Sequence, residues 1–146
     1  MSLSPPLPDA PAPTGRLAGA QQRYRRDGAT AASPSRVLVM GYERLLRDLR
    51  DGERAIVNGN RVESHRALMH AQELVDALDQ SLDPDQWDGA AGLRAIYQHL
   101  NLELVTANVE QDRRRIAHCI EIVTPLLDAW TEAARITANQ LATTAP

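Results

Sequence analysis

The sequence predicts an all-α fold: an antiparallel up-down four-helix bundle, preceded by a short N-terminal helical capping segment and a disordered N-terminal tail. Apolar residues recur at intervals of three and four over four long segments, which places them on one side of a helix. Aromatic residues make up only 3% of the chain and Phe is absent, so the core must be aliphatic. The connections between the four segments are short and polar, so consecutive helices should lie antiparallel.

The first 32 residues are expected to lie outside the bundle. Residues 1–20 are mainly Pro, Ala, Ser and Gly, and they cannot bury enough apolar surface to offset their chain entropy, which predicts a disordered tail. Residues 21–32 become polar around a single aromatic residue, Tyr24, and form the predicted capping segment.

The first bundle helix has clear start and stop signals. Ser33 can cap the free amide groups, Pro34 suits the first helical position, and Gly59 suits a left-handed end. Its apolar side consists of Leu38, Tyr42, Leu45, Leu49 and Ile56.

Two further helices follow. The second should run from about Arg61 to Leu82, because Asp83-Pro84 prevents its continuation. The third should begin weakly in the glycine-containing residues 89–92 and end near Ala107.

The fourth helix should begin near Asp112, which is a plausible N-cap. Pro125 lies within its apolar pattern and predicts a bend near Ile122. These boundaries give a bundle over residues 33–138 and a frayed C-terminus over residues 139–146.

Several function classes find no support in the sequence. The net charge of −3 offers no electrostatic basis for nucleic-acid binding, and no apolar stretch reaches the length of a membrane span. The Glu-x-x-His pattern of di-iron bundles is absent, and the single cysteine, Cys119, follows the pattern of a core residue. His99 and Glu103 are interpreted as a solvent-side pair. We therefore expect a cytoplasmic protein that is not an enzyme and has no cofactor, no metal site and no membrane insertion.

Two helices carry more apolar residues than one stripe requires. The fourth helix has a second apolar row that consists of Ile122, Leu126, Ala129, Ala133 and Ile136. The first helix likewise adds Val39 and Leu46. This extra width has two interpretations: it fills a thick core, or it forms a groove for an amphipathic helix from another chain.

The order of several short motifs resembles the flagellin-specific export chaperones of the FliS family. Tyr24 is followed by the Thr-Ala-Ala-Ser-Pro start of the first helix at residues 30–34 and by Met-Gly-Tyr-Glu at residues 40–43. The later residues that keep the family's spacing are Leu93, Ile96, Tyr97, Leu104, Ala107, Asn108, Asp112 and Trp130.

The resemblance implies a cytoplasmic chaperone that holds the disordered C-terminal region of flagellin, which becomes helical as it wraps the bundle. Holding this region prevents premature polymerisation and delivers the subunit to the type III export apparatus, with the flagellar export gate as a further partner. In the family the N-terminal segment can occupy part of the groove, which makes Tyr24 either a displaceable plug or a fixed cap.

The candidate partner-binding residues are Tyr24, Leu38, Val39, Tyr42, Leu46, Ile122, Leu126, Ala129 and Ala133. The alternative function is a structural or adaptor bundle that binds another protein or itself. The sequence leaves both a monomer and a weak homodimer open.

Overall fold

Four antiparallel helices form the bundle in the computed structural model, which describes residues 34–83, 85 and 88–144. The predicted tail, the capping segment with Tyr24 and the Ser33 cap therefore lie outside the described residues. The helices are α2 (Pro34–Val57), α3 (Arg61–Gln80), α4 (Ala90–Glu110) and α5 (Arg113–Thr144). Each helix packs against two neighbours, and α5 closes the ring by packing against α2. The predicted all-α up-down bundle is confirmed.

The turn between α2 and α3 follows the sequence signals. Gly59 has a φ of +72°, a left-handed conformation that glycine adopts without a steric penalty, so the predicted helix end is confirmed. The Asn60 side chain then accepts a hydrogen bond of 3.1 Å from the backbone N–H of Glu63 and caps α3.

The α4–α5 connection is held against α3. Gln111 is left-handed, with a φ of 55°, and its side-chain oxygen accepts a hydrogen bond of 3.1 Å from the buried Ser64 hydroxyl of α3. Asp112 accepts a hydrogen bond of 3.0 Å from the backbone N–H of Arg114, which confirms Asp112 as the start of the last helix.

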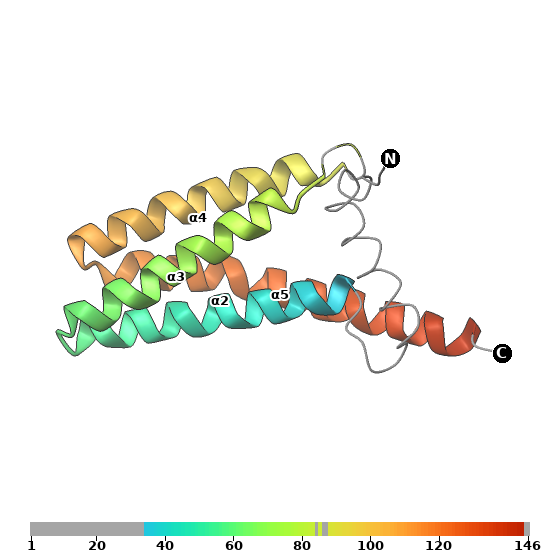
Figure 1. Ribbon diagram of the computed structural model, residues 1–146, viewed down its shortest axis with the longest axis horizontal. Coiled ribbons are helices and arrows are strands. Elements are labelled where there is room, and N and C mark those ends of the chain that lie inside the picture. The colour runs from blue at the N-terminus through green and yellow to red at the C-terminus, as the bar shows by residue number, and fades with distance from the viewer. Residues whose placement is uncertain (1–33, 84, 86–87, 145–146) are drawn as a thin grey trace, which may run out of the picture.

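The last helix is longer than the sequence predicted. α5 continues without interruption to Thr144, beyond the predicted end of the bundle at residue 138, and fraying from residue 139 stays a prediction. Pro125 lies inside this helix, and the neighbouring Thr124 hydroxyl donates to the Ile120 carbonyl. The bend near Ile122 stays a prediction. Figure 1 shows that the C-terminal part of α5 projects beyond the ends of the other three helices.

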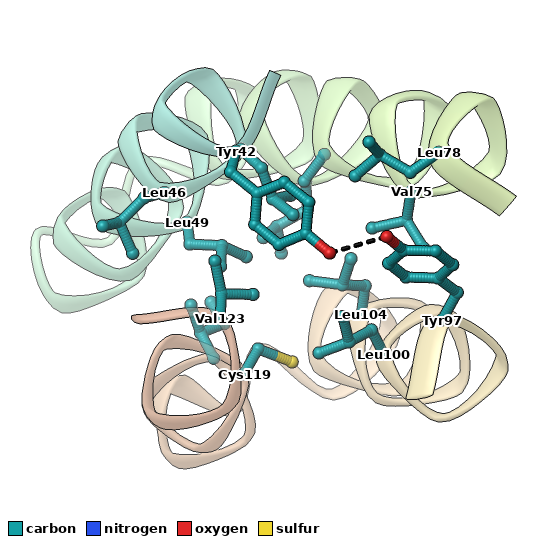
Figure 2. Packing of buried hydrophobic residues seen from close by; sticks show 14 of the residues in the cluster. Tyr42, Leu46, Leu49, Val75, Leu78, Tyr97, Leu100, Leu104, Cys119 and Val123 are labelled. Atoms are coloured by element: carbon teal, nitrogen blue, oxygen red, sulfur yellow. Dashed lines mark hydrogen bonds between the residues drawn. The ribbon is translucent and has the colours of Figure 1, made fainter. Parts of the chain in front are cut away.

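The core is aliphatic along most of the bundle, as Figure 2 shows. Leucine side chains from three helices, among them Leu49, Leu100 and Leu104, are at most 1% exposed. A charged group is also buried: Asp48 of α2 is 1% exposed and is held by the side chains of Arg44 and His70. These hydrogen bonds offset the cost of removing the carboxylate from water.

No helix in the described part of the chain combines the length and apolar character that crossing a membrane requires.

The core assignment predicts that Leu100→Ala lowers the free energy of unfolding by about 2–5 kcal/mol, because a buried leucine leaves a cavity. Leu102 lies two residues along the same helix and is 64% exposed, so Leu102→Ala should change stability by no more than about 0.5 kcal/mol. Urea denaturation followed by circular dichroism measures both. Equal losses in the two variants would contradict this placement of α4.

Candidate functional site

A cavity of about 270 Å³ opens at the end of the bundle where α2 and α4 begin and α3 ends. We call it the end pocket. Its lining combines apolar and aromatic side chains with a polar edge after α3, and it consists of Leu38, Ser81, Leu82, Asp83, Leu93, Tyr97 and Trp130. The volume is below the range of about 300–1,000 Å³ that is usual for small-molecule sites, so it suits one or two side chains of a partner.

Three aromatic residues lie beside this pocket and join three helices. The Tyr42 and Tyr97 hydroxyls form a buried hydrogen bond of 2.6 Å, which Figure 2 shows between α2 and α4. The Tyr42 ring lies 6.4 Å from the Trp130 ring of α5, measured between centroids. Burial raises the pKa of Tyr42, although its hydrogen bonds to Tyr97 and Trp130 oppose this, and burial together with the Tyr42 hydroxyl raises the pKa of Tyr97. Both phenols are therefore neutral near pH 7 and have a structural role.

Two contacts set how α5 lies against α4. The ring nitrogens of His99 and His118 are 3.0 Å apart, and the Arg115 guanidinium donates to the Glu103 carboxylate at 2.9 Å. Because the helices are antiparallel, this register places the start of α4 near Leu127 of α5. The remainder of α5, up to Thr144, has no α4 residues beside it.

The second apolar row of α5 extends on both sides of Leu127, the level at which α4 begins. The exposure of each row residue depends on which side it lies. Ile122 and Leu126 precede Leu127, where α4 still runs beside α5, and they are half-buried against the core. Ala129 and Ile136 lie beyond it and are exposed, whereas Ala133 is half-buried. Of the three row residues beyond the start of α4, two are therefore exposed and one is half-buried.

The candidate residues of α2 are placed differently. Val39, Tyr42 and Leu46 are 1%, 0% and 6% exposed, so as bundle core they are not available to a partner in this structure. In this structure the extra apolar width of α2 thus lies in the core. Leu38 lines the end pocket, and Tyr24 lies outside the described residues.

A further exposed apolar row was not identified from the sequence. Leu102, Val105 and Val109 of α4 are 64%, 46% and 70% exposed, and Met69 of α3 is 41% exposed. The spacing of three and four in Leu102, Val105 and Val109 could have revealed this row, because α4 is apolar on both its inner and outer sides.

The cysteine and histidine side chains considered for chemistry are placed as follows in the described part of the chain. Cys119 is fully buried, and burial raises the pKa of its thiol to about 12, so it is core filling as predicted. Among the described residues, no three or more His, Cys, Asp or Glu side chains are grouped to hold a metal ion. The predicted pairing of His99 with Glu103 is replaced by two contacts to α5, one from each residue.

The fold and the site place the chain in a class of proteins: all-α bundles with a small apolar pocket at one end and an amphipathic last helix that projects beside it. A family model described as flagellar protein FliS matches residues 17–137. The chain therefore belongs to the FliS family, and the family predicted from the sequence is confirmed.

Individual relatives agree with this assignment. The chain is 27% identical over 110 residues to the flagellar secretion chaperone FliS of Bacillus subtilis (strain 168). The matched region covers 75% of this chain and 82% of that protein. A solved structure described as a crystal structure of a flagellar chaperone from bacteria has the same fold, with a TM-score of 0.67 at 20% identity. That similarity covers 82% of this chain and 98% of the other.

The buried tyrosine pair predicts a measurable coupling. Tyr97→Phe removes one hydroxyl and leaves the other without this partner, which should cost about 1–3 kcal/mol of unfolding free energy. Tyr42→Phe should behave similarly, and the double variant should lose less than the sum of the two. A double-mutant cycle by urea denaturation gives the coupling energy, and strictly additive losses would show that the two hydroxyls do not interact.

Proposed function

We propose that this chain is a cytoplasmic export chaperone that binds the C-terminal region of flagellin, which is disordered when free. Binding prevents premature polymerisation and aids delivery to the type III export apparatus, where the flagellar export gate is a further partner. The chain carries out no catalysis in this role. Membership of the FliS family and similarity to a flagellar secretion chaperone support the proposal.

The observation that carries the proposed binding mode is the partly exposed apolar row of α5 beyond the start of α4. Ala129 and Ile136 are exposed there, and their small and aliphatic side chains allow an apolar helix from a partner to pack closely. Trp130, which lines the end pocket, follows Ala129 directly, so the row lies about 100° around α5 from the pocket. In this proposal a partner helix covers the row and a flanking apolar side chain enters the pocket.

The combined surface suits a partner that folds as it binds. Ordering a disordered segment consumes about 2–5 kcal/mol of the gross interaction, so contact must extend over several helical turns. The α5 row from Ile122 to Ile136 spans about 20 Å at 1.5 Å per residue, which meets that requirement.

The candidate residues take two roles in this proposal. Leu38, Ile122, Leu126, Ala129 and Ala133 contact flagellin. Val39, Tyr42 and Leu46 support that surface from within the core, since they are buried.

The α4 row supports a second candidate function, an adaptor bundle or a self-associating protein. Leu102, Val105 and Val109 form an apolar stripe on the outer side of α4, which a second copy or another protein can cover. Analytical ultracentrifugation of the wild-type chain and of Val105→Asp separates a dimer through α4 from a monomer.

The proposed surface predicts that a flagellin C-terminal peptide binds the chain at micromolar concentrations, gains helicity and shows a negative heat-capacity change. Ala129→Asp should weaken binding by about tenfold or more, because a carboxylate would be desolvated against the partner's apolar face. Ala138→Asp is the matched control: Ala138 is also exposed, and nine residues at about 100° each place it on the opposite side of α5.

Isothermal titration calorimetry of the three proteins distinguishes two failures. No binding by the wild-type chain would overturn the proposed function itself. If the wild-type chain binds the peptide and Ala129→Asp and Ala138→Asp bind it equally well, only the proposed surface is overturned.

The plug role of Tyr24 predicts that Tyr24→Ala tightens flagellin binding, because removal of a competing occupant increases the population of the open site. The fixed-cap role predicts instead a lower melting temperature with unchanged or weaker binding. Calorimetry and thermal denaturation on the same variant decide between the two. A variant with unchanged affinity and unchanged stability would exclude both roles.

A further inference from the structure

One pair of side chains outside the proposed flagellin surface has the geometry of a ligand pair. His99 of α4 and His118 of α5 are both exposed, and their Nε2 atoms are 3.0 Å apart. Their ring centroids are 5.2 Å apart and the rings are nearly perpendicular, at 86°. We propose that His99 and His118 form a two-histidine site for a divalent transition-metal ion that clamps α4 to α5.

The spacing of the two nitrogens agrees with joint coordination. Zinc–histidine bonds are about 2.0–2.1 Å long, so two such bonds at right angles or at a tetrahedral angle hold their nitrogens roughly 2.9–3.4 Å apart. The observed 3.0 Å lies within this range. Binding then requires mainly a rotation of each ring that makes both Nε2 lone pairs converge, and exposed side chains can rotate in this way.

A metal ion can replace the hydrogen bond between the two rings. Without metal, one neutral ring must donate its Nε2–H to the Nε2 lone pair of the other, so one hydrogen bond holds the two rings together. A metal ion accepts both Nε2 lone pairs once the donating ring carries its proton on Nδ1 instead of Nε2, so two neutral rings bind the ion without net loss of a proton. Imidazole nitrogen is a preferred ligand of Zn²⁺, Cu²⁺ and Ni²⁺, and Cu²⁺ should bind most tightly of these.

The surrounding structure holds the two ligands in place. One turn away from the pair, the Arg115–Glu103 ion pair joins the same two helices. Water completes the coordination in this proposal, because no third His, Cys, Asp or Glu joins the pair within the described residues. The other two histidines serve as contrasts, since His65 lies beside the Asn108 amide and His70 beside the buried Asp48 carboxylate.

The test uses the full chain without a polyhistidine tag, titrated separately with ZnCl₂, NiCl₂ and CuCl₂ in a buffer that does not chelate metals. We expect saturable binding of one ion per chain. His99→Ala and His118→Ala should each weaken it about tenfold or more, because the second ligand acts at high effective concentration. His65→Ala is the matched control and should bind like the wild-type chain.

Two further measurements separate a metal site from a purely structural contact. Electron paramagnetic resonance of the Cu²⁺ complex should show two coupled nitrogens in the wild-type chain and one in either single variant. Bound metal should also raise the melting temperature of the wild-type chain but not of His118→Ala. The proposal is overturned if His99→Ala and His118→Ala bind metal as the wild-type chain does, or if the wild-type chain shows no saturable binding at millimolar metal.

Discussion

The hydrogen bond between Tyr42 and Tyr97 crosses the diagonal of the bundle and sets the position of α4 relative to α2. These two helices are not neighbours, yet their hydroxyls meet at 2.6 Å in an otherwise aliphatic interior. An unpaired buried hydroxyl costs about 1–3 kcal/mol, so a slide of either helix by one turn is penalised. The end pocket opens beside Tyr97 and Trp130.

The length of the neighbouring helices decides whether extra apolar width becomes core or surface. α2 lies between α3 and α5 and contacts both, so its additional residues Val39 and Leu46 are buried. α5 has the same kind of additional row, but α4 begins near Leu127 and gives no cover beyond that point. The same sequence pattern therefore has two outcomes within one molecule.

This dependence marks the limit of prediction from the sequence. The four helices, the left-handed Gly59 and the Asp112 start depend on local signals, and the structure agrees with each of them. The placement of Leu46 depends on which helix lies beside it, and the His99–His118 contact depends on the register of two helices. Periodicity within a single helix contains neither piece of information. The extent of α5 is a related case: the sequence places the end of the bundle at residue 138, whereas the helix continues to Thr144.

The two exposed apolar surfaces lie toward opposite ends of the bundle, which bears on how one small domain can serve two partners. The end pocket includes Leu93, near the start of α4, whereas the outer row of α4 extends to Val109. At 1.5 Å per residue these two positions are about 24 Å apart along the helix. A helical segment on α5 and the end pocket therefore leaves the outer row of α4 uncovered. Under the proposed function, a partner on the first surface leaves the second accessible, and contacts at the two surfaces do not compete for the same side chains.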